Sequence, residues 1–316
     1  MSSRSGERVA GDPLRLGFVG LGNLGRHLAA SLLRAGFPLT VYDRDEAAAQ
    51  PLLAAGAAWA ASPRDVAAAS DTVFTCLPSP KAVTDVLTGE AGLLEGFAPG
   101  STWIDSSTND RHELQRLAEL AEAQSVHCLE APVTGGVHLA ASGQITVLVG
   151  GDADVFAAHL PAFEAIGGRV FHIGPLGSAS VIKVITNMLA FIHLVAAGEG
   201  LMLARRAGLD LAQSFEVIRA SSGTSFVHET ESQVILNGSY DIGFTMDLAC
   251  KDLGFAHELG DELGVPLELA NLVEQTFIRA REEYGGAAWS PMVVKLLEDA
   301  LGTDLRAPGF PASVSA

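Results

Sequence analysis

The alternation of strand-like and helical segments is the feature that most constrains the fold of this chain. Between residues 14 and 176, short apolar runs of the β type alternate with segments of helical periodicity. The strand-like runs are LRLGFVG, LTVYD, TVFTCLP, STWIDSS, VHCLEAPV, QITVLVGG and RVFHIG. Strands that alternate with helices pair in parallel through right-handed crossovers. We therefore expect an α/β domain over residues 14–176.

The strand-like runs stop after the turn at residues 174–177, and only helical periods follow. The expected helices cover residues 187–206, 212–220, 251–263, 268–282 and 292–301, separated by Gly, Pro and Asn signals. This pattern predicts an all-helical second domain over residues 177–305. A flexible arm, residues 1–13, precedes the two domains, and a tail expected to be loose, residues 306–316, follows them.

One long segment, residues 181–203, is apolar on almost every helical face. Such a helix is normally buried in a large core or in a membrane, and about 20 residues are enough to span a bilayer. Lys183, Asn187, His193 and Glu199 would be costly in lipid, so we expect a core helix and no membrane partner.

The net charge of the chain indicates which partners are disfavoured, and its cysteines indicate the cellular compartment. A formal net charge of −17 disfavours binding to nucleic acid and to anionic membranes. The three cysteines, Cys76, Cys128 and Cys250, are scattered, with neither a C-x-x-C pair nor a histidine at zinc spacing. This pattern indicates reduced thiols in a cytoplasmic protein and no metal site.

A glycine-rich turn after the first strand predicts a dinucleotide site. Its residues are Gly20, Leu21, Gly22, Asn23, Leu24 and Gly25. The first glycine permits the tight turn, the second lets the backbone approach a pyrophosphate, and the third allows close packing of helix on strand. The amino end of the following helix attracts phosphate. The motif is weak alone, but it stands here between a strand and a helix.

Asp43, at the end of the second strand, is the expected partner of the cofactor ribose. An acid there repels a 2′-phosphate and therefore favours NAD over NADP. The neighbouring Arg44 could accept that phosphate, so NADP stays possible. The alternative is that Asp43 caps the helix expected from Asp45.

Lys183 and Asn187 are spaced i, i+4 and share one helix face, where they could hold one substrate oxygen between them. A lysine can exchange a proton near neutral pH if burial and a nearby cation lower its pKa. An oxidised nicotinamide or Lys251 could be that cation. The alternative is that Lys183 extends to solvent while Asn187 is a buried hydrogen-bonding residue. Composition does not decide between the two.

Two further turns could bind ligand. Residues 132–136, PVTGG, could form an anion nest for a carboxylate, or an ordinary turn. Residues 105–108, DSST, end a strand at the edge where α/β sheets bind ligands. The alternative is that Thr108 or Asn109 caps the next helix.

Four ordered motifs together resemble the β-hydroxyacid dehydrogenase family, of the 3-hydroxyisobutyrate dehydrogenase and tartronate semialdehyde reductase type. They are GFVGLGNLG (17–25), EAPVTGG (130–136), GSASVIKVITN (177–187) and KDLGFA (251–256). The likeness extends from about Leu14 to Leu301. It implies a Rossmann-type domain joined to an α-helical domain by a long helix, and a homodimer or homotetramer.

The resemblance also implies roles for individual residues. Lys183 would be the catalytic acid/base and Asn187 its substrate-orienting partner. The substrate carboxylate would be held by Thr134, Gly135 and Gly136. Lys251 would line the cleft near the nicotinamide, and the cofactor would also contact Leu77, Pro78 and Thr108.

The expected reaction is hydride transfer between NAD(P) and the hydroxyl of a small β-hydroxyacid, which gives a semialdehyde or β-keto acid. The chain departs from the family pattern at five positions, which are Glu130 for Asp, Thr134 for Ser, Thr186 for Asn, Ala179 for Gly and His27 for Pro. Two alternatives stay open: an NADPH-dependent imine reductase, which typically lacks the lysine, and a catalytically silent NAD(P)-binding scaffold. Ser222, Phe226 or Phe244 could read the rest of the substrate.

Overall fold

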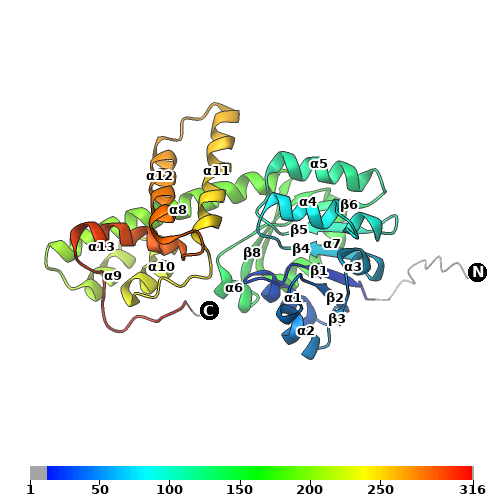
Figure 1. The fold of residues 1–316 in the computed structure, drawn as a ribbon, viewed down its shortest axis with the longest axis horizontal. Coiled ribbons are helices and arrows are strands. Elements are labelled where there is room, and N and C mark those ends of the chain that lie inside the picture. The colour runs from blue at the N-terminus through cyan, green and yellow to red at the C-terminus, as the bar shows by residue number, and fades with distance from the viewer. Residues whose placement is uncertain (1–12, 315–316) are drawn as a thin grey trace, which may run out of the picture.

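A computed structural model describes residues 13–314, and the expected N-terminal arm lies almost wholly outside this range. The first half of the chain is a three-layer α/β unit, and the second half is helical (Figure 1). The strands are β1 Leu16–Val19, β2 Leu39–Tyr42, β3 Ala58–Trp59, β4 Thr72–Thr75, β5 Thr102–Asp105, β6 His127–Glu130, β7 Val133–Thr134, β8 Ile145–Gly151 and β9 Gly167–Gly174. The helices among them are α1 Gly25–Arg34, η1 Glu46–Ala49, α2 Gln50–Ala54, α3 Pro63–Ala69, α4 Pro80–Thr88, η2 Leu93–Glu95, α5 Arg111–Glu122, α6 Val137–Ala141 and α7 Ala153–Ile166.

The strands form one sheet in the order β3-β2-β1-β4-β5-β6-β8-β7, with β9 paired to β8. The pairing is parallel from β3 to β6, as expected, whereas β8 runs antiparallel to β6 and β7. The register aligns Val19 with Thr75, Thr75 with Asp105, and Asp105 with Glu130. Four strands therefore end at one carboxyl edge, where ligands bind in open α/β sheets.

Helices cover both faces of this sheet. α1 and α7 pack on one face through Leu28, Leu32 and Phe163, while α3, α4 and α5 cover the other. Strands β1, β4 and β5 are buried along their whole length. Burial on both faces explains why these strands lack the strict alternation of apolar and polar residues that is typical of half-exposed strands.

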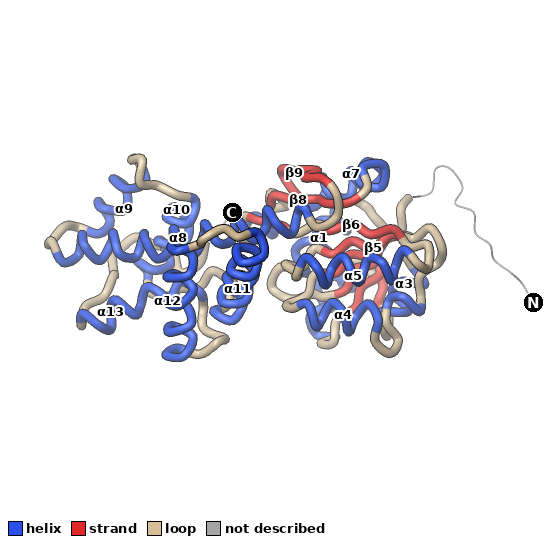
Figure 2. Tube along the Cα trace, turned by 90° about the horizontal axis from the view of Figure 1, so that it is seen from above, coloured by secondary structure: helices blue, strands red, loops and turns tan. Residues whose placement is uncertain are grey.

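The second half of the chain is built on one long helix. The helices are α8 Ser178–Arg206, α9 Leu211–Arg219, α10 Phe226–Asn237, α11 Met246–Leu263, α12 Glu268–Tyr284, η3 Ser290–Val294 and α13 Lys295–Leu301. α8 packs against β8 near its start, and the other helices surround its far half (Figures 1 and 2). α8 thus begins nine residues before the helix start expected at Asn187 and joins the two halves. It is long and apolar enough to cross a membrane, and 33% of its most apolar window is buried inside the molecule.

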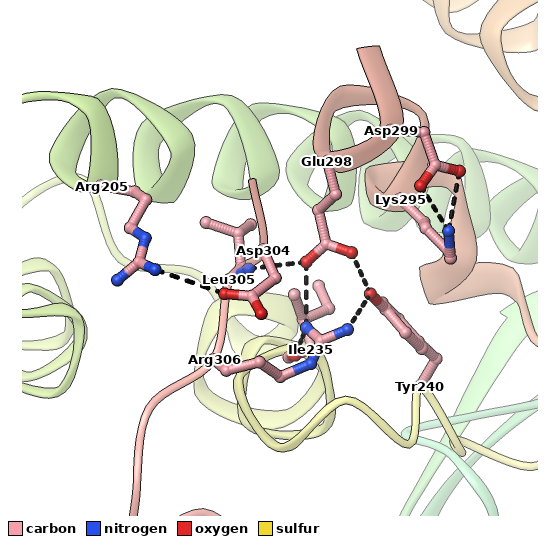
Figure 3. Close-up of polar contacts among 9 residues, drawn as sticks. All are labelled: Arg205, Ile235, Tyr240, Lys295, Glu298, Asp299, Asp304, Leu305 and Arg306. Carbon is pink, nitrogen blue, oxygen red and sulfur yellow. Dashed lines mark hydrogen bonds and ion pairs between the residues drawn. The ribbon is translucent and has the colours of Figure 1, made fainter. Parts of the chain in front are cut away.

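The chain after α13 packs on the helical domain instead of being loose. Arg306 donates to Glu298 Oε1 at 2.9 Å and to the hydroxyl of Tyr240 at 2.8 Å, and Tyr240 donates to Glu298 Oε2 (Figure 3). Glu298 is only 5% exposed. Phe310 packs edge-on against Phe215 of α9. The C-terminal segment is therefore part of the fold as far as these contacts reach.

Candidate active site

The glycine-rich turn after β1 has the backbone that a dinucleotide requires. Gly20 has a φ of +98°, and a Cβ there would lie 2.3 Å from the carbonyl oxygen of Cys76. A Cβ on Gly25 would lie 2.0 Å from the Gly20 oxygen, whereas one on Gly22 would meet nothing within 4 Å. No side chain caps α1, and its first turn holds no acid. The helix start without a side-chain cap and the open space at Gly22 fit a pyrophosphate.

Asp43 lies at the end of β2 against this turn. Its Oδ2 accepts a hydrogen bond from the amide of Leu21 at 2.6 Å, and its Oδ1 accepts one from Asp45 at 2.9 Å. The side chain that caps the following helix is Asp45 itself. Asp43 therefore contacts the glycine-rich turn (residues 20–25, the proposed nucleotide turn), and Arg44 beside it is exposed. This placement fits a carboxylate that faces the ribose end of the cofactor.

A buried carboxylate organises the next two loops along the carboxyl edge. Asp105 is 1% exposed and accepts hydrogen bonds from Thr75 at 2.8 Å, from Asn109 at 3.0 Å and from the Ser107 amide at 3.1 Å. Burial raises the pKa of Asp105, and these hydrogen bonds oppose the rise. The cap of α5 is Asp110, whose side chain accepts from the Glu113 amide, so neither Thr108 nor Asn109 caps this helix.

The loops after β4 and β5 are joined directly. The Leu77 amide donates to Ser107 Oγ at 2.9 Å. The carbonyl oxygen of Thr108 accepts a hydrogen bond from Lys251 Nζ of α11 at 2.8 Å. The structure thus brings Leu77, Pro78 and Thr108 to the same edge as the glycine turn and ties that edge to the helical domain.

Lys183 and Asn187 are buried on α8, with 8% and 9% exposure. Lys183 Nζ donates to Asn187 Oδ1 at 2.8 Å, and Asn187 Nδ2 donates to Asp252 Oδ2 at 2.5 Å. The other oxygen of Asp252 pairs with Lys251 Nζ at 2.8 Å. A continuous polar chain therefore runs from Lys183 on α8 to Lys251 on α11. The surface-directed alternative for Lys183 does not fit this burial.

The surroundings of Lys183 lower its pKa from 10.5 to about 8. Burial is the largest cause, because it removes water from the ammonium ion. Asp252 raises the pKa and Lys251 lowers it. An amine with this pKa is about one part in ten neutral at pH 7, so both protonation states are populated near neutrality.

The turn at residues 132–136 leads from β6 into α6 at the same edge. Gly135 and Gly136 both have positive φ, +123° and +88°, and α6 follows Gly136 directly, with no side-chain cap. Successive amides in such a turn form an anion-binding concavity. The ring of His138 in α6 stacks on Phe226 of α10 with centroids 6.1 Å apart, so the helical domain contacts this turn.

The start of α8 is held by the strand that precedes this turn. Glu130, the last residue of β6, is 1% exposed and accepts hydrogen bonds from the amides of Gly177, Ala179 and Ser180. The Ser180 hydroxyl also donates to it.

Comparison with known proteins agrees with this architecture. The NAD binding domain of 6-phosphogluconate dehydrogenase matches residues 15–174, and the NAD-binding domain of NADP-dependent 3-hydroxyisobutyrate dehydrogenase matches residues 177–297. A 2-(hydroxymethyl)glutarate dehydrogenase from Eubacterium barkeri is 32% identical over 92% of this chain and 97% of its own. This chain belongs to the β-hydroxyacid dehydrogenase family.

Other members of the family give the same picture. An NAD-dependent L-serine dehydrogenase from Pseudomonas aeruginosa is 36% identical over 77% of this chain and 84% of its own. The solved 3-hydroxyisobutyrate dehydrogenase from Salmonella typhimurium is 33% identical, covers 90% of this chain and 99% of its own, and superposes with a TM-score of 0.84. An imine reductase from a Pseudomonas species shares the fold at 18% identity and a TM-score of 0.62.

No role was predicted from the sequence for two of the buried acids in the site, Asp252 and Glu130, although Glu130 was noted as a departure from the family pattern. Asp252 stands next to Lys251 in the KDLGFA motif, and Glu130 opens the EAPVTGG motif, so both lie in segments that the sequence marked. Of the possible substrate-reading residues, Phe226 lies near the turn, Phe244 packs near Phe191, and Ser222 is exposed. Among residues 13–314, no group of three or more His, Cys, Asp or Glu could hold a metal ion.

Proposed function

We propose that this protein reversibly oxidises the hydroxyl of a small β-hydroxyacid to a semialdehyde or β-keto acid, with NAD as the hydride acceptor. The observation that carries the proposal is the buried chain from Lys183 through Asn187 and Asp252 to Lys251. A scaffold that only binds NAD(P) needs none of these residues. Burial of the Lys183 ammonium group costs free energy and lowers its pKa, and such a perturbed group beside other polar side chains favours a catalytic role.

In this mechanism Lys183 transfers a proton and Asn187 orients it. The neutral amine of Lys183 accepts the proton of the substrate hydroxyl as the carbon loses its hydride, and it returns that proton in the reverse reaction. Asn187 accepts from Lys183 and donates to Asp252, which fixes the direction of the Lys183 amine. When bound, the nicotinamide supplies the site that accepts the hydride.

Binding of the substrate and cofactor uses the turns of the carboxyl edge. Thr134, Gly135 and Gly136 would hold the substrate carboxylate. The pyrophosphate would lie on the turn Gly20–Gly25, and Asp43 would take the ribose hydroxyls. Because a carboxylate repels a 2′-phosphate, we propose NAD as the preferred cofactor, with Arg44 leaving NADP accessible. Leu77, Pro78, Thr108 and Lys251 would complete the cofactor site.

The localisation, oligomeric state and partners of the enzyme are also proposals. We propose a cytoplasmic homodimer or homotetramer without a nucleic-acid or membrane partner. The net charge of −17 supports the exclusion of nucleic acid. Exposed apolar side chains along α8, Ile185, Leu189 and Leu203, support association of subunits.

A substrate panel tests the proposal. Purified protein is mixed with NAD or NADP and a set of C3–C4 hydroxyacids, and reduced cofactor is followed by absorbance. We expect reduction of NAD with at least one hydroxyacid. Binding of NAD without any reaction in either direction would support the scaffold, and activity only on cyclic imines with NADPH would support the imine reductase.

A further inference from the structure

The helix that carries Lys183 has no cap of its own. α8 has 29 residues and starts after Gly177, whose φ is +97° and which offers no side chain. Its first turn contains no acidic residue. The first amides of a helix have no partner within the helix, and leaving them buried without one is costly.

Glu130 supplies this cap from another element. Its Oε1 accepts from the Gly177 amide at 2.6 Å and from the Ala179 amide at 2.8 Å. Its Oε2 accepts from the Ser180 amide at 2.9 Å and from the Ser180 hydroxyl. Both oxygens are thus used, and a carboxylate at a helix amino end is favoured by the helix dipole.

Strand β8, which pairs with β6, has a glycine opposite Glu130 and so leaves room for its carboxylate. A Cβ on Gly150 of β8 would lie 2.2 Å from Glu130 Oε1 and 2.9 Å from Glu130 Cγ. Gly150 does not have the positive φ that would itself require glycine. Its lack of a side chain is therefore explained by the space that Glu130 occupies.

Glu130 also stands next to the turn proposed to hold the substrate carboxylate. Val133 and Thr134 form β7 three residues further along the chain, and the glycines of the turn follow. On the other side of the contact, Lys183 lies three residues, or about one helical turn, after Ser180. One side chain thus connects the carboxylate turn to the start of the catalytic helix.

We propose that Glu130 is a positioning residue that fixes Lys183 relative to the carboxylate turn. It contacts neither the reacting atoms nor Lys183, and it acts through the first turn of α8. The proposal rests on the function proposed above for Lys183. Loss of the Glu130 carboxylate should slow the proton and hydride transfer step, because small displacements of a catalytic group such as Lys183 have large effects on rate.

The principal test is Glu130→Gln, which keeps the shape of the side chain. Its amide nitrogen would face two hydrogen-bond donors in place of one of the two acceptors. We expect kcat for the hydroxyacid to fall at least tenfold, with the dissociation constant of NAD within twofold of wild type. The pH limb of kcat should stay near that of wild type, because Glu130 is not among the charges that act on Lys183.

A second variant displaces the carboxylate without removing it. Gly150→Ala places a methyl group 2.2 Å from Glu130 Oε1, so the carboxylate must move, and kcat should fall as in Glu130→Gln. The matched control is Asp210→Ala, which removes the cap of α9, where Asp210 accepts from the Gln213 amide at 2.7 Å. The control should lower the melting temperature but leave kcat within twofold.

The outcomes separate positioning from other roles. An unchanged kcat in Glu130→Gln, or a loss no larger than that of Asp210→Ala at equal melting temperature, would overturn the proposal. Disappearance of the pH limb would also overturn it, since Glu130 would then carry the proton. If wild type oxidises no hydroxyacid, the proposed function fails. Amide hydrogen exchange then tests separately whether Glu130 holds the start of α8. Exchange of the Ala179 and Ser180 amides at least tenfold faster in Glu130→Gln would uphold the positioning of α8, and unchanged exchange would refute it.

Discussion

At the scale of single residues, Lys183 is a buried cation whose surroundings hold it near the point of losing its proton. Asn187 and Asp252 extend from it towards Lys251, so the amine is fixed in direction as well as shifted in pKa. The i, i+4 spacing of Lys183 and Asn187 could be predicted from the sequence. The role of Asp252 could not, because the amide it accepts from belongs to a residue 65 positions earlier in the chain.

Replacement of Lys251 tests how the charges near Lys183 set the pKa of its amine. Lys251 lowers the pKa of Lys183, so Lys251→Met should raise that pKa and make the neutral amine scarcer at a given pH. The pH limb of kcat for oxidation at saturating NAD should therefore lie at higher pH in Lys251→Met than in wild type. Lys81→Met is the matched control, because Lys81 is exposed and pairs only with Asp85 among the described ion pairs. A limb that stays in place or moves to lower pH in Lys251→Met would contradict the account.

At the scale of elements, periodicity and glycine signals were sufficient for many of the helices and strands, but α3, α4 and α10 were not predicted. The reason is clearest for α10. Residues 226–237 have no clear apolar stripe, because His228, Thr230 and Ser232 are buried. His228 bonds to the carbonyl oxygen of Phe215 and to Ser232, which satisfies these polar groups inside the helical domain. Tertiary hydrogen bonds of this kind leave no mark in the local pattern.

The nucleotide turn allows two glycines to be compared within one element. Gly22→Ala adds a methyl group in open space, so the stability of the ligand-free protein should change little while the dissociation constant of NAD rises at least tenfold. Gly25→Ala places a methyl group against the Gly20 oxygen and should cost about 1–3 kcal/mol of unfolding free energy as well. Urea unfolding and NAD titration of both variants measure these effects. Retention of NAD affinity in Gly22→Ala would place the pyrophosphate elsewhere.

The contacts of Arg306 in the C-terminal segment predict that its replacement lowers the free energy of unfolding. Arg306→Met leaves the buried carboxylate of Glu298 without its cation, which should cost about 3 kcal/mol in urea unfolding. Arg205→Met breaks an exposed pair with Asp304 and should cost under about 1 kcal/mol (Figure 3). The double variant Glu298→Gln with Arg306→Met should recover part of the loss. Equal losses in the two single variants would mean that burial of Glu298 is unimportant.

At the scale of the whole molecule, α8 connects a sheet with one ligand-binding edge to a helical domain that contributes Lys183 and Lys251. Its exposed face carries Ile185, Leu189 and Leu203, which repeat on one side of the helix and are 36%, 43% and 71% exposed. A strip of this kind on a single chain is typical of an interface. The two-part architecture could be predicted from the sequence, whereas the face of α8 that stays exposed could not, because it depends on how the surrounding helices pack.

The double variant Leu189→Asp with Leu203→Asp tests this strip as a subunit interface. Charges placed in a buried apolar contact should weaken association by at least tenfold, because they would lose hydration. Sedimentation velocity over a range of concentrations should find a dimer or tetramer for wild type and a monomer for the variant. A monomeric wild type would show that the strip serves no subunit contact.

The central claim is that Lys183 transfers the proton of the hydroxyacid while the cofactor binds independently of it. Lys183→Ala, assayed with NAD and the best hydroxyacid of the panel, tests this most directly. We predict that turnover falls by at least a thousandfold, while the dissociation constant of NAD, measured by titration, stays within about threefold of wild type. Turnover close to wild type in Lys183→Ala would contradict the account.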